Sequence, residues 1–420
     1  MNVNASRGSK RLRRIPICPI LVLILLGSVG NQSCFSQWKM HVIDNTSRGA
    51  DGVRLADFNQ DGLLDIVTGW EEGGVIRVYQ NPGPRSVRDP WPRVTVGKVK
   101  SPEDAVFADL DGDGSLDVVS CCEGKTKTVF VHWAPKEKGK YMVDGAWETA
   151  PIPATEKVAA WMFSLAADFD GKNGIDLLVG SKGNNASVGW LESPKNPRNL
   201  KGWKFHLIED AGWIMSLRKV EVMKRMHFLV SDRKGPHRGV YFLSNDFGKG
   251  FDNDRWKRTN VMKGSLEYMF LDYSKASQIN DANRNSESQG GVVTVATRNK
   301  KSIRFLMNKR LEVAERFEIA NPQDIPNGKA IVSGDIDLDG KLDLVFSANT
   351  QAFKNKKTVG GLHWLSGRSG FRDTQPIASP KGKKYDRIEL IDLDGDGDLD
   401  ALTCEEAANL GVIWFENPAR

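Results

Sequence analysis

Cysteine is rare in this sequence of 420 residues, with five in total, and two of these, Cys18 and Cys34, lie near the N-terminus. The other three, Cys121, Cys122 and Cys404, are too few for the disulfide framework that holds many small exported proteins together. Cys121 and Cys404 occupy equivalent positions in an internal repeat described below, which indicates small buried side chains rather than redox chemistry. The fold must therefore depend on its core, with bound metal as the other available stabiliser.

The sequence also lacks the short motifs of the common enzyme classes. It contains no nucleophile elbow, no P-loop, no histidine-based zinc motif, no Cys-x-x-Cys and no Arg-Gly-Asp tripeptide. Four of its six histidines fall in two pairs at matching repeat positions, which indicates packing: His41 with His206, and His132 with His363. His237, in a loop, is the candidate general base.

A strong charge of one sign is absent as well. Five units of the formal net charge of +6 come from Arg7, Lys10, Arg11, Arg13 and Arg14, which leaves +1 for the rest of the chain. This near-neutral balance gives no support for a nucleic-acid-binding surface.

One long apolar run is present, IPICPILVLILLGSVG at residues 15–30, and it follows the basic residues directly. With small residues at Cys34 and Ser36, this is the pattern of an export signal that leaves Gln37 as the new N-terminus. The run is about four residues shorter than the roughly 20 that span a bilayer, which favours cleavage over a retained membrane anchor. We therefore expect a signal peptide at 1–36, an exported domain at 37–420 (secreted, periplasmic or at the cell surface) and no stable membrane span.

Self-alignment divides the rest of the chain into seven units, spaced by 52 to 63 residues. Each unit has an apolar strand, a loop that is acidic in most units and a second apolar strand, as in GVRLADFNQDGLLDIVTGW at residues 52–70. A third strand bearing Trp or Phe follows, as in VIWFENP at residues 412–418. A period of this length is typical of propellers and arrays, and short alternating strands between turn residues indicate an all-β fold.

The two ends of the repeat region complement each other. The last unit ends after its third strand, whereas WKMHVID at residues 38–44 resembles the fourth strands WKFHLIED at 203–210 and WKRTNVM at 256–262. An N-terminal strand that completes the last unit closes a ring and hides its sheet edges. We predict a seven-bladed β-propeller of four-stranded blades, closed in this way.

The acidic loops follow the pattern D-x-[DN]-x-D-G-x-x-D. Side chains at positions 1, 3 and 5 converge when such a loop curls, Gly at position 6 permits the positive φ of the turn, and Asp at position 9 returns from the next strand. Oxygen ligands without His or Cys select Ca²⁺ over zinc or copper, and Mg²⁺, which demands a stricter octahedron, is the weaker alternative. A bound cation relieves the repulsion among the carboxylates.

Four loops carry the complete pattern and predict four calcium sites. Their ligands are Asp57, Asn59, Asp61 and Asp65; Asp109, Asp111, Asp113 and Asp117; Asp335, Asp337, Asp339 and Asp343; and Asp392, Asp394, Asp396 and Asp400. The third unit keeps the acids Asp168, Asp170 and Asp176. Its Lys172 at position 5 leaves two alternatives, a fifth ion or a lysine ammonium in place of one. Unit four has RKVEVMKRMH, which predicts a plain hairpin, and unit five has Asp272 followed by a polar insertion.

These repeats resemble FG-GAP (VCBS-type) repeats, which form the blades of integrin α-subunit propellers and of many exported bacterial proteins. The resemblance covers essentially all of residues 38–418 and is specific at the five acidic loops. It implies that each loop joins the first two strands of a blade on one face and binds Ca²⁺ structurally. The departures in units four and five leave metal binding there in doubt, but not the blades.

Any ligand is then expected on the opposite face, where second strands turn into third strands and where the chain enters each blade. The candidates are Glu71, Glu123, Trp161, Lys182, Trp213, Arg233, Lys234, Arg298, Glu405 and Glu406. Aromatic rings stack on sugar faces, and charged groups bind hydroxyls or uronate carboxylates. The plainer interpretation is that the charges are solvated and the aromatics pack between blades. Lys182, Arg233 and Lys234 fall on neighbouring units and form the first cluster to test.

Two functions follow. The first is a binding module for a glycan or protein ligand. The alternative is a carbohydrate-active lyase or keto-sugar dehydratase, by analogy with other propellers. That chemistry needs a base and a cation, roles for which His237 or Tyr385 and Lys182 or Arg233 are candidates. A deep pocket in which His237, Lys182 and Arg233 converge would favour the enzyme.

Overall fold

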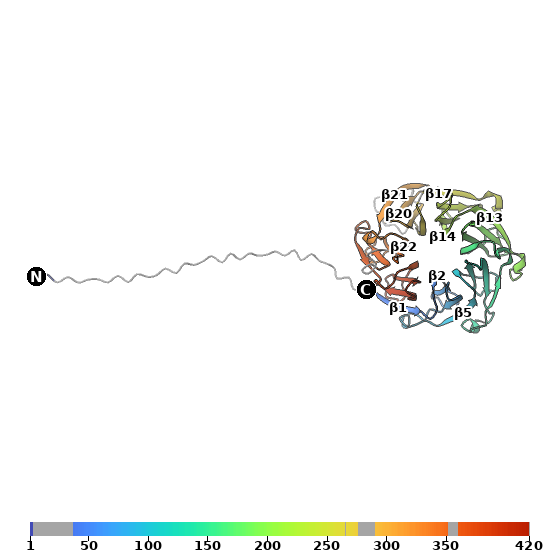
Figure 1. Ribbon diagram of the computed structural model, residues 1–420, viewed down its shortest axis with the longest axis horizontal. Coiled ribbons are helices and arrows are strands. Elements are labelled where there is room, and N and C mark those ends of the chain that lie inside the picture. Colours follow the sequence, from blue (N-terminus) through green and yellow to red (C-terminus); the bar gives the residue numbers. More distant parts are fainter. Residues whose placement is uncertain (3–36, 265, 276–289, 352–359, 420) are drawn as a thin grey trace. The chain divides into compact units, whose positions relative to one another are not determined.

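The computed structural model describes residues 1–2, 37–264, 266–275, 290–351 and 360–419. Residues 3–36 of the predicted signal peptide and residues 276–289 of the polar insertion lie outside this range. From residue 39 onward, the described chain forms seven antiparallel four-stranded sheets arranged in a ring (Figure 1). The predicted all-β, seven-bladed propeller is confirmed.

Each blade takes four strands that are consecutive in sequence, except the last. Blade 1 consists of β2 (Ala50–Ala56), β3 (Asp65–Trp70), β4 (Val75–Tyr79) and β5 (Arg93–Lys98). Blade 2 consists of β6 (Pro102–Ala108), β7 (Asp117–Cys122), β8 (Thr128–Trp133) and β9 (Glu148–Pro151). Blade 3 consists of β10 (Ala160–Ala167), β11 (Asp176–Lys182), β12 (Ser187–Glu192) and β13 (Lys204–Asp210). Blade 4 consists of β14 (Ile214–Val222), β15 (Arg225–Asp232), β16 (Gly239–Ser244) and β17 (Lys257–Lys263), and blade 5 of β18 (Tyr268–Ser274), β19 (Gly291–Thr297), β20 (Lys301–Met307) and β21 (Val313–Ala320). Blade 6 consists of β22 (Gly328–Gly334), β23 (Asp343–Ala348), β24 (Leu362–Leu365) and β25 (Thr374–Pro376). Blade 7 consists of β26 (Tyr385–Ile391), β27 (Asp400–Glu405), β28 (Gly411–Glu416) and β1 (Lys39–Asp44).

The N-terminal strand β1 closes the ring as predicted. It pairs antiparallel with β28, with Lys39 opposite Glu416 and Val42 opposite Ile413. Ile43 of this strand is buried at 1% exposure in the core shared by blades 7 and 1. Blade 7 is therefore assembled from the two ends of the repeat region.

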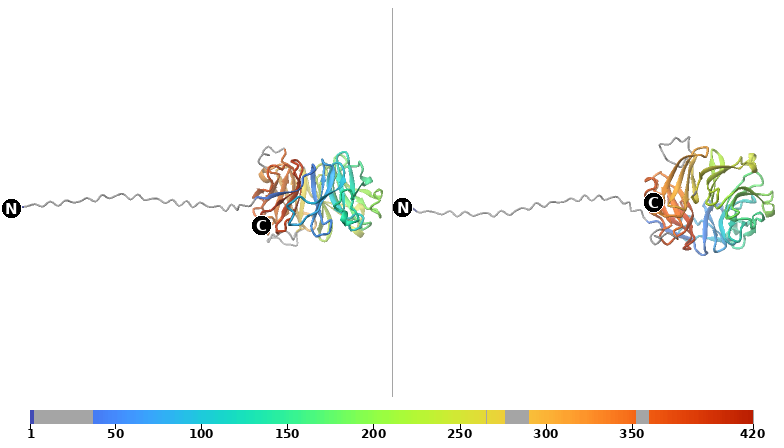
Figure 2. Two further views of the ribbon diagram at one scale, coloured as in Figure 1. Left: turned by 90° about the horizontal axis from the view of Figure 1, so that it is seen from below. Right: turned by 45° about the horizontal axis from the view of Figure 1, so that its top comes forward.

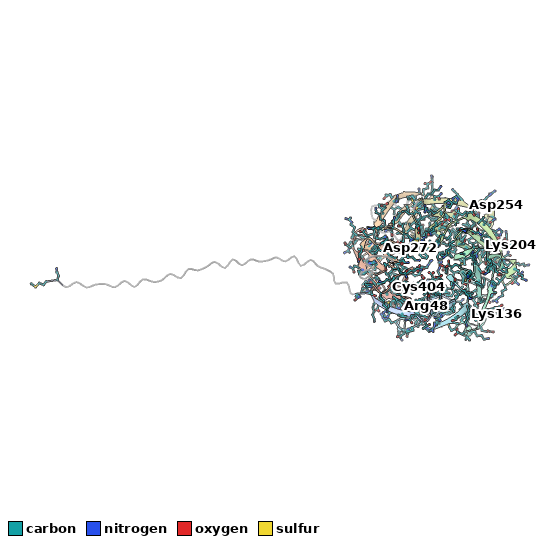
Figure 3. The ribbon with its side chains drawn as sticks, viewed as in Figure 1. Arg48, Lys136, Lys204, Asp254, Asp272 and Cys404 are labelled. Carbon is teal, nitrogen blue, oxygen red and sulfur yellow. The ribbon has the colours of Figure 1, made fainter. Side chains whose placement is uncertain are left out.

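The blades lie around a central axis. First strands such as β2, β14 and β22 line the centre in Figure 1, and fourth strands such as β5, β13 and β17 form the rim. Figure 2 shows the propeller edge-on as a disc, and Figure 3 places Lys136, Lys204 and Asp254 at its rim and Cys404 nearer the centre. The core lies within and between blades and includes the fully buried Trp70, Trp161, Trp190 and Trp414.

Strand direction sorts the loops onto two faces. The acidic face carries the turns from first to second strands, residues 57–64, 109–116, 168–175, 335–342 and 392–399. The entry face carries the turns from second to third strands, such as 71–74, 123–127, 183–186, 233–238 and 406–410, together with the connections into the next blade. This is the separation that the repeat predicted.

Helix is confined to single 3-10 turns in the described residues. These are η1 (Lys138–Lys140), η2 (Pro153–Thr155), η3 (Leu200–Gly202), η4 (Gly248–Gly250), η5 (Asn253–Arg255) and η8 (Pro322–Asp324). Among the residues that the structure describes, no helix has the length and apolar character needed to cross a membrane.

Blade 4 replaces the acidic loop with the plain hairpin that its sequence predicts. Met223 and Lys224 join β14 to β15, and both have positive φ, 53° and 59°. Positive φ at both central residues is the geometry of a type I′ turn, whose twist matches that of the flanking strands. The other six blades do not share this tight connection.

The histidines have the packing roles that their repeat positions predict. His41 and His206 each approach a glutamate at 2.7 Å, Glu416 and Glu192 respectively, and stack on the tryptophan of the neighbouring strand. His132 is fully buried, and this burial lowers its pKa to about 3. His363 is buried as well.

Candidate functional site

The acidic loops share one backbone arrangement. In each complete loop the N–H of the glycine at position 6 donates to the aspartate at position 1, as Gly114 does to Asp109 at 3.1 Å and Gly397 to Asp392 at 3.0 Å. These glycines have φ between 82° and 94°, a region open to glycine at no steric cost. Position 4 also has positive φ, even in Leu338 at 58°. The curl predicted from the pattern is present.

The aspartate at position 9 has a second role that the sequence did not reveal. Asp117 accepts the N–H of Leu110 at 3.2 Å and that of Ala134 at 2.8 Å, so it joins the acidic loop to the end of the third strand. Asp65, Asp176, Asp343 and Asp400 make the same two bonds in their blades. We call these five residues the position-9 clamps. Their strict repetition explains why the acid persists in the third unit.

Burial of a position-9 clamp is costly unless its charge is compensated. Desolvation by burial raises the pKa of Asp65 to about 6 and that of Asp117 and Asp400 to about 7. The two backbone N–H bonds lower these pKa values only in part. A cation beside the carboxylate would favour its ionised form.

The carboxylates of the loops fit a divalent cation. In the second loop, oxygens of Asp109, Asp111 and Asp117 lie within 4.8 Å of one another, and the first, third and fifth acids of the sixth blade form a similar group. One oxygen each of Asp109 and Asp335 is buried with no hydrogen-bond partner among the described residues. Buried, unsatisfied carboxylate oxygens gathered this closely are what a calcium ion would satisfy.

Basic side chains approach several of these loops from outside. Arg198 of blade 3 lies 2.5 Å from Asp111 of blade 2, and Arg88 of blade 1 lies 2.5 Å from Asp394 of blade 7. In the third unit, Lys172 is 3.5 Å from Asp170 and is exposed. That contact fits the alternative in which the lysine ammonium offsets the acids of this loop, whose Asp168, Asp170 and Asp176 also group together.

One acidic residue lies elsewhere than the repeat alignment placed it. Asp272 is inside β18, paired with Thr294, and not at the start of a loop. It forms an ion pair with Arg218 of blade 4 at 2.9 Å and accepts the N–H of Ser333 of blade 6 at 3.0 Å. Asp272 of blade 5 thus connects its own blade with blades 4 and 6.

Replacing a position-9 clamp should destabilise the protein even without metal. Asp117→Ala leaves two buried N–H donors without acceptors, so we expect a loss of about 2–4 kcal/mol in unfolding free energy. Denaturant unfolding in EDTA measures this loss of unfolding free energy without any contribution from bound metal. Glu148→Ala, at an exposed position of the same blade, is the control and should stay within about 0.5 kcal/mol of the parent. Equal stability of Asp117→Ala and the parent would contradict the clamp.

On the entry face, the predicted cluster forms around Trp213. The indole centroid lies 4.7 Å from Lys182 Nζ, 4.3 Å from Arg233 Cζ and 4.8 Å from Lys234 Nζ. Two of these cations have acidic partners, Lys182 with Glu123 and Arg233 with Glu267. Lys234 is exposed and has no ion pair within the described part of the chain. We call Trp213, Lys182, Arg233 and Lys234 the Trp213 cluster.

A pocket of about 590 Å³ opens beside this cluster. Trp213 and Lys182 form one side, Glu123 and Lys127 come from blade 2, and Asn184 adds an amide. Its lining combines an aromatic ring, two ammonium groups and hydrogen-bonding side chains. This combination suits a polar ligand that carries negative charge.

Three residues expected on the entry face are buried instead. Trp161 has no exposed surface, and its Nε1 donates to the carbonyl of Thr155. Tyr385 is 1% exposed, and burial raises its pKa, so it is not a base open to a ligand. Glu405 is fully buried and accepts N–H groups of its own blade, including that of Ala408 at 2.8 Å. The register shifts directly after Trp161 in β10 and after Tyr385 in β26, which the sequence pattern does not show, whereas Glu405 is the last residue of the second strand β27.

The remaining candidates do lie at the entry face. Arg298 is 3.6 Å from Glu267 and so joins the acid that also binds Arg233. Glu71, Glu123 and Glu406 are half-buried in the first positions after their second strands. Glu71 and Glu406 each lie close to the carboxylate of Asp51.

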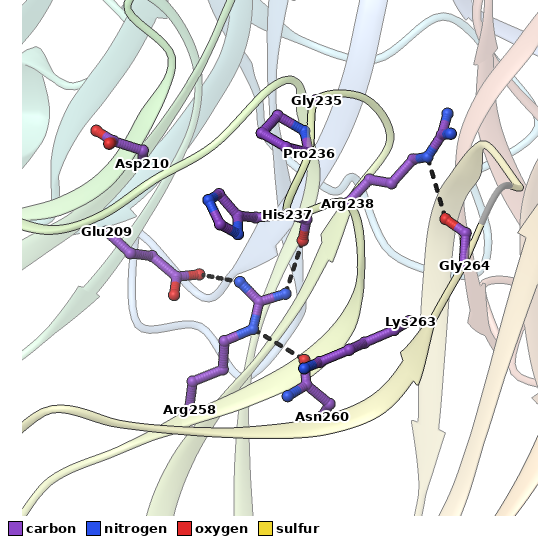
Figure 4. Close-up of a pocket in the computed structure, with 10 residues that line it drawn as sticks. All are labelled: Glu209, Asp210, Gly235, Pro236, His237, Arg238, Arg258, Asn260, Lys263 and Gly264. Atoms are coloured by element: carbon purple, nitrogen blue, oxygen red, sulfur yellow. Dashed lines mark hydrogen bonds and ion pairs between the residues drawn. The ribbon is translucent and has the colours of Figure 1, made fainter.

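His237 lies in a different pocket, of about 610 Å³, between blades 3 and 4 (Figure 4). Arg258 crosses this pocket, donating to the carbonyl of His237 at 2.7 Å and pairing with Glu209 at 2.9 Å. Neither Lys182 nor Arg233 lines it. The convergence of these side chains that an eliminating enzyme would need is not found among the described residues.

Two stretches match the family model described as the FG-GAP-like repeat, residues 57–120 and 335–403. They include all four complete acidic loops, each from its first to its last aspartate. No curated protein matches the sequence. The sequence-derived assignment of the repeat type is thus confirmed by an independent comparison.

Solved structures are similar in fold. AfRom2 CNH domain is 10% identical, with a TM-score of 0.50 over 90% of this chain and 98% of that chain. BBS1N, crystallised in complex with ARL6DN, is 10% identical, with a TM-score of 0.49 over 91% and 96%. The Dos1 propeller is 11% identical, with a TM-score of 0.48 over 91% and 95%. At such identities the likeness concerns the fold alone.

Proposed function

Since the chain is a seven-bladed β-propeller of FG-GAP-like repeats, we propose that it is a calcium-stabilised binding module whose ligand site is the Trp213 cluster and its pocket. The observation that carries this proposal is the convergence of three cations from two blades on one indole ring. A propeller fold serves as an interaction module, and the acidic face is occupied by its own repeated loops. The entry face is where blades differ from one another and where a ligand can be selected.

The chemistry of the cluster favours an anionic glycan as the ligand. Trp213 offers an aromatic face, and the ammonium of Lys234 is exposed. Lys182 pairs with Glu103 and Glu123 and the buried Arg233 pairs with Glu267, so Lys234 is the cation of the cluster that has no acidic partner within the described residues. A uronate-bearing sugar would stack on the ring while its carboxylate pairs with these groups. A protein ligand with an acidic surface loop is the other occupant that the same charges would accept.

The ion assignment is part of this proposal. Asp57, Asp109, Asp335 and Asp392 begin the loops that would each hold one Ca²⁺, with the fifth loop dependent on Lys172. When bound, the ion neutralises the converging carboxylates. Export, proposed from the N-terminal pattern, would bring these loops to a calcium-rich compartment, and N-terminal sequencing of the secreted or periplasmic protein tests it by the appearance of Gln37.

A glycan array that includes uronate polysaccharides tests ligand binding, with an ultraviolet assay for unsaturated uronates run in parallel. We expect retention of uronate-bearing glycans without ultraviolet-absorbing products. Lys234→Ala should weaken binding by about tenfold, which corresponds to about 1.4 kcal/mol. Lys136→Ala, an exposed lysine at the rim (Figure 3), is the matched control. Equal affinity of Lys234→Ala and the parent would exclude this cluster as the site, and accumulation of unsaturated products would favour the lyase.

A further inference from the structure

A second group of acids lies on the entry face, near the axis around which the blades are arranged and apart from the repeat loops. Blades 7, 1 and 2 each contribute two carboxylates from equivalent positions, one early in the first strand and one just after the second strand. These are Asp386 and Glu406, Asp51 and Glu71, and Glu103 and Glu123. We call these six residues the channel acids. No other three consecutive blades of the described chain repeat this pair.

Lysines neutralise the outer pairs of channel acids. Lys182 of blade 3 is 3.1 Å from Oε1 of Glu103 and also contacts Oε2 of Glu123, so it pairs with one oxygen of each acid of blade 2. Lys384 contacts Glu406 and lies 3.9 Å from Asp386, so it occupies both acids of blade 7. Lys329 of blade 6 adds a second contact to Asp386.

The central pair, Asp51 and Glu71 of blade 1, forms no ion pair within the described residues. Burial raises the pKa of both carboxylates, although the charges of Lys384 and Lys329 lower the pKa of Asp51 in part and those of Lys384 and Lys182 lower that of Glu71 in part. Asp51 is 8% exposed, and no hydrogen bond or ion pair reaches its carboxylate from any residue that the structure describes. Glu71 has the carboxylate of Glu123 as its side-chain neighbour, a contact between two acids. A buried carboxylate without a partner is unfavourable unless something outside the chain compensates it.

The carboxylates converge on the space in front of blade 1. Oxygens of Asp51, Glu71 and Glu103 lie within 4.8 Å of one another, and oxygens of Asp51, Asp386 and Glu406 do so as well. Asp51 belongs to both groups and therefore stands between them. In addition, Oδ2 of Asp386 is buried without a hydrogen bond within the described residues.

We propose that this convergence is a further divalent-cation site, held by Asp51, Glu71 and Glu103 and distinct from the sites in the repeat loops. All donors are carboxylate oxygens, which favours a hard ion such as Ca²⁺ over zinc or copper. Lys182, Lys329 and Lys384 form ion pairs with the acids of blades 2 and 7. The ion would therefore lie beside the carboxylates of blade 1. The half-buried Glu71 provides the route from solvent.

Metal counting on the full chain tests this site. Protein dialysed against buffered Ca²⁺ is analysed for bound calcium by mass spectrometry, as the parent and as Asp51→Asn, Glu71→Gln and Glu148→Gln. We expect Asp51→Asn and Glu71→Gln each to hold one ion fewer than the parent, and the exposed control Glu148→Gln to hold the same number. An Asp111→Asn, Asp113→Asn double variant should also lose one ion, and its combination with Asp51→Asn should lose two.

Thermal melting gives a second, independent readout. In EDTA, Asp51→Asn should melt at or above the parent temperature, because the unpaired buried carboxylate is gone. On addition of Ca²⁺, the melting temperature of the parent should rise by more than that of Asp51→Asn. The difference in melting temperature seen in EDTA should therefore become smaller or change sign. Equal ion counts and equal Ca²⁺-induced shifts for Asp51→Asn and the parent would overturn the proposal. Glu71→Gln decides the question if Asp51→Asn fails to fold, and neither result depends on whether the Trp213 cluster binds a glycan.

Discussion

Deletion of residues 37–44 is expected to abolish the cooperative folding of the propeller. These residues contain β1, the fourth strand of blade 7, and without it the whole edge of β28 is exposed. Trp38 and Ile43 leave the core at 8% and 1% exposure, a loss of about 1.5–3 kcal/mol for each side chain. Asp44 leaves as well, and with it the acceptor for Arg77 at 2.6 Å and for the Tyr79 hydroxyl at 3.0 Å.

The sum of these losses is comparable with the total stability of a typical domain, about 5–15 kcal/mol. Circular dichroism melting and analytical gel filtration of the deletion variant measure the effect. A matched control replaces only the exposed Lys39 and Met40 of β1 by serine, which keeps the backbone pairing and should melt close to the parent. A synthetic peptide of residues 37–46 added to the deletion variant should restore part of the transition. A deletion variant that melts with the parent would contradict the closure of the ring by β1.

Removal of divalent cations is the second change with a large expected effect. If four loops each hold an ion present at 100 times its Kd, binding contributes about 2.7 kcal/mol for each loop. For a folded region of this length, that total corresponds to a fall in Tm of about 10 °C in EDTA. Burial raises the pKa values of Asp65, Asp117 and Asp400, because the ionised carboxylate is unfavourable there when no cation is bound. The same unfavourable charge is expected to lower the Tm in EDTA.

Differential scanning calorimetry with EDTA, Ca²⁺ and Mg²⁺ measures this effect. Ca²⁺ should restore the parent Tm and Mg²⁺ should restore less of it, because Mg²⁺ demands a stricter octahedron. The double variant Asp111→Ala, Asp113→Ala loses one loop and should show a correspondingly smaller Ca²⁺-induced shift. Its ligand binding on the entry face should be unchanged. A Tm that is insensitive to thorough chelation would reject the assignment of calcium to the loops.

The blades and their closure could be predicted from sequence because each is encoded locally and repeated. A strand, turn and strand that recur seven times leave few alternative folds. WKMHVID could be predicted as the missing fourth strand because it resembles the fourth strands of other units. The hairpin at Met223 and Lys224 was predictable for the same reason: apolar strands continued through a stretch with no acidic pattern. In unit five, Asp272 was expected at the start of a loop but lies inside β18, paired with Thr294.

The entry face was predicted less well, because it depends on register. Trp161 and Tyr385 lie near the starts of first strands, just before a shift in register, and Glu405 ends a second strand, yet all three are buried. Trp213 and Lys182 were correctly assigned to one surface. The channel acids had no local signature, because each pair combines residues about 20 positions apart whose meeting requires the ring. The position-9 clamps were hidden likewise, since the N–H partner of Asp117 at Ala134 becomes visible only with strand pairing.

The pairing of β1 with β28 also has a consequence for synthesis. His41 and Glu416 are 375 residues apart, so β1 finds its partner only after the strands of the other six blades have been synthesised. Until then β1 has an unpaired edge, and any product that stops before β28 keeps that edge permanently. We therefore expect chains that lack β28 to be prone to proteolysis or aggregation, because their β1 edge is unpaired. Synthesis of β28, rather than of any single earlier blade, is what allows β1 to pair.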